Sequence, residues 1–169
     1  VLGIIPGVPQ PSQKRFETLV WDALRGFDAW RPVFVESESK KVGNVAVPEA
    51  LIARMRASDC IDLHLPDDER VALLMEDYAF FLRDPELFCQ RLAALTELRG
   101  KTVVDEWLAQ VRAGHVEPVV RELLAKHYDP GYAASIRRNF KRFGEGKAIA
   151  LKDRSPQSMA AAARSLVQA

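Results

Sequence analysis

The stretch CIDLHLPDDERVALLMEDYAFFL, residues 60–82, decides the fold class because its hydrophobic pattern changes once, at Pro66. Residues 60–65 form a short apolar run of the length of a strand, and Pro66 ends it. Beyond Pro66, with Asp67 as the expected cap, apolar residues recur at the spacing of a helix: Val71, Leu74, Met75, Tyr78 and Leu82. The stretch therefore predicts a strand followed directly by a helix.

Working outward, the pattern stays helical from this point to about Phe143. The run Val33-Phe34-Val35 predicts a buried strand, residues 148–151 predict a last strand, and further helices are expected after Ser12, from Pro48 to about Ala57, and after Ser155-Pro156. Short strands separated by helices indicate an α/β fold, an open sheet with a large helical region. We expect one domain, residues 1–169, with an α/β part (1–66 and 148–169) and a helical region (67–147).

Composition bounds the possible functions. The chain has 169 residues, 48% of them hydrophobic, and a formal net charge of +1. It is long enough to bury a core, and any basic surface for nucleic acid has to be local. The two cysteines, Cys60 and Cys89, lie far apart in apolar patterns and are expected to be buried thiols in the cytoplasm. The three histidines form no plausible zinc set, and no apolar run is as long as a membrane span.

Two stretches imitate a phosphate-binding P-loop. In Gly100-Lys101-Thr102 the earlier glycine that the motif requires is replaced by Leu95, and the preceding segment is helical. We therefore expect Gly100 to end one helix and Lys101 to begin the next. In Gly144-Glu145-Gly146-Lys147 the required Ser or Thr is replaced by Ala148. Neither stretch predicts a P-loop.

Polar residues gather directly after the run at 33–35, in Glu36-Ser37-Glu38-Ser39-Lys40-Lys41. Open α/β sheets bind ligands beyond the carboxyl ends of their strands. Glu36 and Glu38 would lie on the same side of a strand, where they could bind hydrated Mg²⁺ or supply a general base. The alternative is a solvated charged turn, which is the commoner case in an arbitrary protein. The pattern leaves both open.

The stretch from Arg137 to Lys147 is basic, with Arg137, Arg138, Lys141, Arg142 and Lys147 against the single acid Glu145. If a helix ran through it with Ile136, Phe140 and Phe143 inward, Arg138 and Arg142 would share an outer face. The stretch is either a solvated helix surface or a contact for RNA phosphates. Composition favours neither.

Three stretches resemble one family, in the same order and at similar spacing. They are QPSQKRFE (Gln10–Glu17), VFVESESKKVG with VPEALIARMR (Val33–Gly43 and Val47–Arg56), and LLAKHYDPGYAASIRRN (Leu123–Asn139). Together they resemble the C-terminal half of tRNA 2-selenouridine synthases. The resemblance implies a P-loop-like sheet. It also implies a selenotransferase that converts wobble 2-thiouridine to 2-selenouridine through a geranylated intermediate, with geranyl diphosphate and selenophosphate as substrates.

The resemblance also implies partners and sites. Its partners would be tRNA and the family's rhodanese and P-loop segments, which this chain lacks; the chain is then a fragment or a split-gene product and inactive alone. Neither cysteine matches the rhodanese nucleophile, and Lys40 stands where the family often has Arg. The site residues it implies are Glu36 and Glu38 for catalysis, Gln13, Lys14, Arg15, Ser39 and Lys40 for substrate, and Arg137, Arg138, Lys141 and Arg142 for RNA, with no assigned metal ligand.

Two other functions stay open. One is a nucleotide phosphotransferase remnant derived from a P-loop protein, which would bind a nucleotide with magnesium near Glu36. The other is a non-catalytic helical interaction module, which would bind neither diphosphate nor tRNA. The segment Tyr128-Asp129-Pro130 with Tyr132 also matches a family motif of unknown role, although Asp129-Pro130 could simply break a helix.

Overall fold

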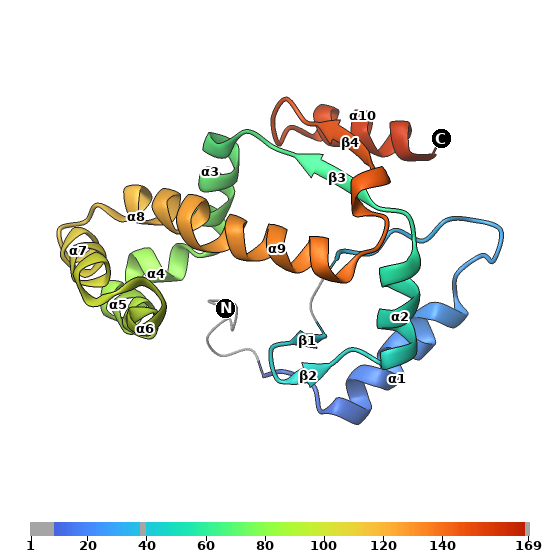
Figure 1. Ribbon diagram of the computed structural model, residues 1–169, viewed down its shortest axis with the longest axis horizontal. Helices are drawn as coiled ribbons and strands as arrows, with labels where there is room; N and C mark the ends of the chain where they lie inside the picture. Colours follow the sequence, from blue (N-terminus) through green and yellow to red (C-terminus); the bar gives the residue numbers. More distant parts are fainter. Residues whose placement is uncertain (1–8, 38–39, 168–169) are drawn as a thin grey trace. The chain divides into compact units, whose positions relative to one another are not determined.

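The computed structural model of the chain describes residues 9–37 and 40–167. Its residues form two compact units: unit 1 comprises Val1–Cys60 and Ile136–Glu145, and unit 2 comprises Ile61–Ser135 and Gly146–Ala169. The chain is mainly helical with a few short strands (Figure 1). The expected α/β fold with few strands and a large helical region is thus confirmed. The expected division of a single domain into an α/β part and a helical region stays a prediction.

Unit 1 contains the N-terminal helix, a hairpin and a second helix. Its elements are α1 (Gln13–Arg25), β1 (Lys41–Val42), β2 (Val45–Ala46), α2 (Glu49–Ala57) and the 3₁₀ turn η2 (Phe143–Glu145). α1 begins as the sequence predicts, because the Ser12 hydroxyl accepts a hydrogen bond from the Arg15 amide at 3.3 Å. β1 and β2 are antiparallel, with Lys41 opposite Ala46 and Val42 opposite Val45.

The run Val33-Phe34-Val35 is not a strand, so this prediction is wrong. Residues 32–37 have no regular secondary structure, and the three apolar side chains are 45%, 51% and 57% exposed. A β-branched and aromatic run becomes a strand only where a neighbouring strand pairs with its backbone and a surface covers its side chains. In the described part of the chain no strand pairs with this segment.

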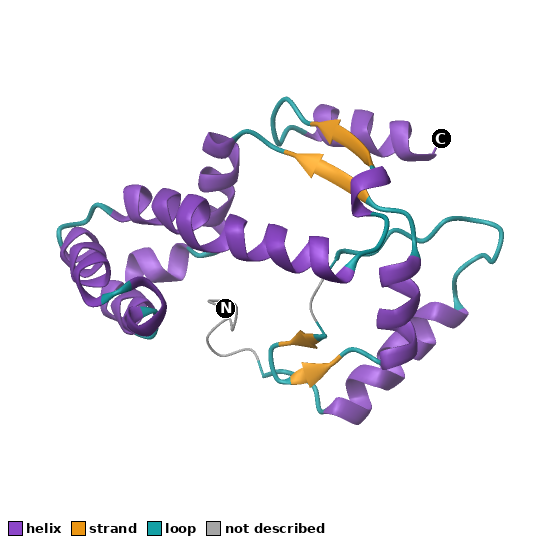
Figure 2. Ribbon diagram, in the orientation of Figure 1, coloured by secondary structure: helices purple, strands orange, loops and turns teal. Residues whose placement is uncertain are grey.

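Unit 2 contains the other strand pair and most of the helices. They are β3 (Ile61–His64), α3 (Asp67–Asp77), α4 (Ala79–Arg83), α5 (Pro85–Ala93), α6 (Thr96–Arg99), α7 (Lys101–Arg112), α8 (Val116–Leu123), η1 (Leu124–Tyr128), β4 (Lys147–Ala150) and α10 (Pro156–Val167). β3 and β4 pair in parallel, from Ile61 opposite Lys147 to His64 opposite Ala150 (Figure 2). Both strands lie where the sequence predicts them. α9 (Asp129–Asn139) runs from unit 2 into unit 1.

The core of unit 2 lies among its helices. α5 packs on α7, and α8 packs on both α3 and α7. The rings of Phe81 and Phe88 stack at 4.9 Å between centroids. The most deeply buried large side chains of the described chain all belong to this unit: Trp107, Phe88, Leu92, Val71, Val104, Val111 and Val119. Because all of them come from helices, this packing explains why the helical stripes of the sequence were informative.

Gly100 separates α6 from α7, as the sequence analysis expects. Its φ of 85° lies in the left-handed region that favours glycine, and α7 begins at the next residue, Lys101. Asp129-Pro130, by contrast, does not break the helix. η1 is a π-helical segment that joins α8 to α9, and its wider turn is closed by a bond from the Asp129 amide to the Leu124 carbonyl. Pro130 is tolerated because the chain reaches it through this turn.

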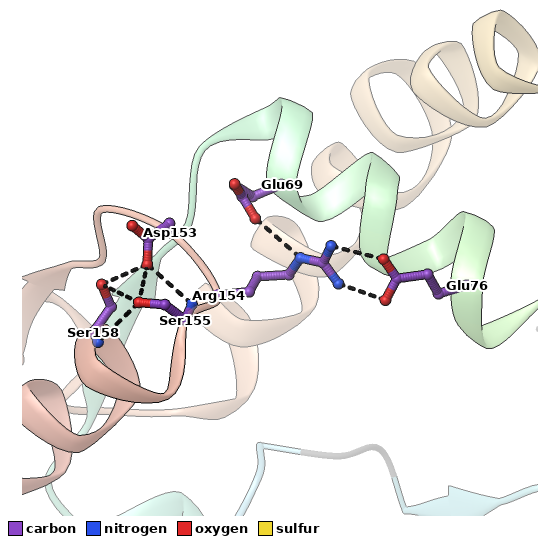
Figure 3. Close-up of polar contacts among 6 residues, drawn as sticks. All are labelled: Glu69, Glu76, Asp153, Arg154, Ser155 and Ser158. Atoms are coloured by element: carbon purple, nitrogen blue, oxygen red, sulfur yellow. Dashed lines mark hydrogen bonds and ion pairs between the residues drawn. The ribbon is translucent and has the colours of Figure 1, made fainter.

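Two polar clusters lie at the start of α10 in unit 2, and one of them connects it with α3 (Figure 3). The Arg154 guanidinium donates to Glu76 through both Nη atoms, at 2.8 and 2.9 Å, and to Glu69 through Nε at 3.0 Å. Next to it, Asp153 accepts hydrogen bonds from the Ser155 amide and hydroxyl and from the Ser158 hydroxyl. These bonds lower the pKa of Asp153 from 3.8 to about 2.

The lowered pKa of Asp153 predicts a pH dependence of stability. A carboxyl group with a lower pKa in the folded chain stabilises it fully above its unfolded value of 3.8, and this contribution disappears as pH falls toward 2. We therefore expect the melting temperature of the Asp153→Asn variant to depend less steeply on pH between about 4 and 2 than that of the unmodified chain. Parallel curves for the two proteins, measured by circular dichroism, would contradict this role of Asp153.

None of the helices in the described ranges is long and apolar enough to cross a membrane.

Candidate functional site

Gln13, one of the expected substrate-binding residues, holds the hairpin. Its side-chain nitrogen donates to the Ala46 carbonyl at 2.8 Å and to Glu17 at 2.7 Å, and its oxygen accepts from the Ala46 amide at 2.8 Å. The carboxamide therefore pairs with the outer edge of β2 as another strand would. Gln13 is a positioning residue in this structure, and substrate contact by its side chain stays a prediction.

Gln10 makes a second clamp at the turn of the same hairpin. Its carboxamide donates to the Val42 carbonyl at 3.1 Å and accepts from the Asn44 amide at 2.6 Å. Gly43 has a φ of 61°, and a Cβ atom there would overlap the Gln10 carboxamide. This hairpin was not predicted from the sequence, although Gly43-Asn44 between two valines is a recognisable two-residue turn. The two glutamines thus fix the start of α1 against the chain that follows Lys40.

The other expected substrate-binding residues are exposed cations near these clamps in the sequence. Lys14 and Arg15 lie in the first turn of α1, and Lys40 immediately precedes β1. Within the described ranges no ion pair involves any of the three, so their charges are available to an anion. The structure brings Lys40 next to the hairpin because the Val47 amide donates to its carbonyl at 2.9 Å. Ser39 lies outside the described residues.

Of the two expected catalytic acids, Glu36 is exposed in the irregular segment after Val35. Glu38 lies outside the described residues. Among those that are described, no group of three or more His, Cys, Asp or Glu side chains is arranged to hold a metal ion. The catalytic role of the two acids stays a prediction.

The basic stretch is not one continuous helix. α9 ends at Asn139, and residues 140–142 turn into the 3₁₀ segment η2. Arg138 and Arg142 consequently do not share a helix face, which corrects that expectation. The turn is held by a backbone bond from the Lys141 amide to the Arg56 carbonyl at 3.3 Å, and by an ion pair between Arg142 and Asp59. Both contacts attach the turn to the end of α2, within unit 1.

These contacts separate the four expected RNA-binding residues into two kinds. Arg142 pairs with Asp59 and, at 3.2 Å, with Glu145, so its charge is compensated within the chain, and RNA contact by this residue stays a prediction. Arg137, Arg138 and Lys141 are exposed, and none has an ion pair with another described residue. Of the four expected RNA-binding residues, these three have charges available to neutralise phosphate groups.

The remaining titratable candidates have structural surroundings. His127 accepts a hydrogen bond at Nδ1 from Arg99 Nε at 3.0 Å, and burial and the Arg99 charge lower its pKa. Cys60 and Cys89 are free thiols; Cys89 is buried as expected, whereas Cys60 is only partly buried, and burial raises the pKa of each. A raised pKa disfavours the thiolate, so neither cysteine is prepared to act as a nucleophile.

Unit 2 has an open cavity of about 740 Å³ between α3 and α8, and none of the expected site residues lines it. Its rim charges are already paired, since Arg121 contacts both Asp68 at 2.7 Å and Glu117 at 3.0 Å. Its floor includes the apolar side chains of Val71 and Met75. The cations expected to bind substrate or RNA lie in unit 1 instead.

Comparison with known proteins gives this arrangement a context. Residues 3–85 match the family model described as the tRNA 2-selenouridine synthase AAA domain. A protein named tRNA 2-selenouridine synthase from Cupriavidus necator is 34% identical, over 73% of this chain and 41% of its own length. The chain is a homologue of the tRNA 2-selenouridine synthases. The resemblance seen in the sequence is thereby confirmed.

Two further synthases also match the chain, over different lengths. The tRNA 2-selenouridine synthase of Shewanella halifaxensis is 28% identical, over 79% of this chain and 44% of its own length. That of Marinobacter nauticus is 39% identical over a shorter stretch, 41% of this chain and 20% of its own length. The chain thus spans about two fifths of the longer-matching synthases. No solved structure matches it significantly.

Proposed function

We propose that this chain contributes tRNA binding and diphosphate binding to a tRNA-modifying selenotransferase. The enzyme would convert wobble 2-thiouridine to 2-selenouridine through a geranylated intermediate. The observation that carries the proposal is the similarity to proteins named tRNA 2-selenouridine synthase, which extends over about three quarters of the chain. The positions of the cations without ion pairs in unit 1 support the assignment of tRNA binding and diphosphate binding to different residues.

The two kinds of binding use different residues. Arg137, Arg138 and Lys141 contact tRNA phosphates, since they are exposed cations without ion pairs in the described ranges. Lys14, Arg15 and Lys40, with Ser39, contact the phosphate groups of geranyl diphosphate or selenophosphate. Gln13 supports the second group by fixing the hairpin that follows Lys40. Glu36 and Glu38 face the reacting groups, as general base or electrostatic partner.

The partners of this chain would include the rhodanese and P-loop segments of the same synthase. An observation in unit 1 supports this. α1 buries none of its residues, and a series of large apolar side chains on and after it is exposed: Leu19, Trp21, Leu24, Phe27, Trp30, Val33, Phe34 and Val35. So many exposed large apolar side chains in one segment are typical of an interaction site. We accordingly propose that the chain alone is inactive.

Binding of tRNA across a salt series tests the proposed function. Replacing Arg137 and Arg138 together with Gln should weaken the binding of different tRNAs to a similar degree, because phosphate contacts carry no sequence information. The slope of log affinity against log salt should become shallower by roughly one to two units, about 0.7–0.9 for each phosphate that is no longer neutralised. The melting temperature should hardly change, since both side chains are exposed.

A matched control is the double variant Arg83→Gln with Arg91→Gln. It removes the same charge from two exposed helical arginines of unit 2, and it should leave the slope unchanged. Equal slopes for the Arg137/Arg138 variant and the unmodified chain would mean that RNA binds elsewhere. The helix start around Lys14 and Arg15 would then be the next region to vary.

A further inference from the structure

Arg56 has an unusual environment for an arginine. It lies in the last turn of α2 and is partly buried, and its Nε atom is buried without a hydrogen-bond partner in the described part of the chain. Other arginines of the protein are matched by carboxylates: Arg70 pairs with Asp129 through both Nη atoms, at 3.0 and 2.5 Å, and Arg112 pairs with Glu86. A buried donor without an acceptor is costly, and in native proteins such a donor often serves an ion or a ligand.

The neighbouring acids do not compensate this charge. Asp59, three residues after Arg56, pairs with Arg142, and so does Glu145. Within the described ranges no ion pair joins Arg56 to any carboxylate. Arg142 therefore forms ion pairs with both Asp59 and Glu145. The positive charge of Arg56 has no such partner in the described ranges, so an external anion could neutralise it.

The chain adds a second cation at the same place. The backbone bond from Lys141 to the Arg56 carbonyl brings the turn after α9 against the last turn of α2. Lys141 is exposed and has no ion pair among the described residues. Two segments that lie far apart in the sequence thus each supply an uncompensated cation at one end of α2, in unit 1.

We propose that Arg56, supported by Lys141, binds a phosphate group. A guanidinium offers several N–H donors in one plane that match the oxygens of a phosphate, and such charge-assisted bonds are the strong ones. Partial burial strengthens the attraction, because the local dielectric constant is lower than in water. The inference rests on the proposed function and deepens it, since it adds a residue from α2 to the anion-binding surface. The phosphate comes either from the tRNA backbone or from a diphosphate substrate.

The test compares three single variants of the chain with two probes. Arg56→Met removes the charge and the donors, Arg56→Lys keeps the charge without the planar donors, and Arg54→Met is the matched control on the same helix, where Arg54 is exposed. The probes are a 2-thiouridine-containing tRNA and inorganic pyrophosphate, with binding measured by titration calorimetry at fixed salt. We expect Arg56→Met to weaken the binding of one probe about tenfold, Arg56→Lys to weaken it less, and Arg54→Met to change it less than about twofold.

Thermal melting separates this role from a structural one. If Arg56 stabilises the fold, Arg56→Met lowers the melting temperature. If Arg56 binds a phosphate, the melting temperature without ligand stays the same or rises, because the substitution removes a buried donor that has no acceptor. Loss of affinity for tRNA alone assigns a backbone phosphate, and loss for pyrophosphate assigns the diphosphate. Affinities unchanged by Arg56→Met overturn the inference, while weaker tRNA binding by the Arg137/Arg138 variant would leave the proposed function standing. If the unmodified chain binds neither probe, both proposals are wrong.

Discussion

Replacing Trp107 with alanine is expected to lower the free energy of unfolding by about 3–5 kcal/mol. Trp107 lies in α7 and is only 1% exposed. It is the largest of the fully buried side chains in the described chain. Truncating it removes the favourable burial of the indole and leaves a cavity between helices that can close only in part. Since small domains are stable by only about 5–15 kcal/mol, much of the stability of unit 2 would disappear.

Urea unfolding followed by circular dichroism measures this effect, and the chain offers its own control. Trp30 is 95% exposed, so Trp30→Ala should change the free energy of unfolding by less than about 0.5 kcal/mol. Similar decreases for both tryptophan variants would contradict the position of the core among the helices of unit 2. If the Trp107→Ala variant is fully unfolded, the expected destabilisation is exceeded. The Trp107→Phe variant, which removes less of the side chain, would then give a measurable decrease in the free energy of unfolding.

The second large effect concerns turnover. In a protein that joins this chain to the rhodanese and P-loop segments, Glu36→Gln or Glu38→Gln is expected to slow formation of 2-selenouridine at least about tenfold, or about 1.4 kcal/mol in the barrier. Each change removes one carboxylate at nearly constant shape, so a metal ligand or general base would be removed with it. The melting temperature of Glu36→Gln should be unchanged, because this side chain is exposed.

The assay uses thiolated tRNA, geranyl diphosphate and selenophosphate, and the 169-residue chain alone serves as the negative control. Normal turnover by both variants would return Glu36 and Glu38 to the interpretation of a solvated charged turn. Turnover by the chain alone would contradict the proposal that it needs the other segments. The two outcomes are independent, so each hypothesis can fail separately.

The elements that the sequence predicted correctly are those with local causes. The Ser12 cap, the helix break at Gly100 and the end of β3 before Pro66 depend on neighbouring residues alone. The prediction at Val33-Phe34-Val35 failed because a strand also needs a partner, which no local pattern supplies.

The site depended on distant residues even more. Arg142 looked equivalent to Arg138 in the sequence, and only the fold brings Asp59 to it. The sequence predicts Gln13 as a substrate contact, and its hydrogen bonds to the Ala46 backbone are visible only in the folded structure. Arg56 was overlooked, because a lone arginine near the end of a helix resembles any solvated cation until its surroundings in the fold are known. A residue pattern identifies charge, whereas compensation of that charge is a property of tertiary structure.

The parallel pairing of β3 with β4 has a consequence for the order in which the chain folds. The two strands are neighbours, with a final bond from the Leu151 amide to the His64 carbonyl at 2.7 Å, yet most of the helices lie between them in the sequence. Bringing such distant segments together costs loop-closure entropy before the short ladder returns any stability. Helices form from local contacts and lose little by forming first, so they shorten the effective separation of the two strands. We therefore expect the strand pair to form late, after the helices have assembled.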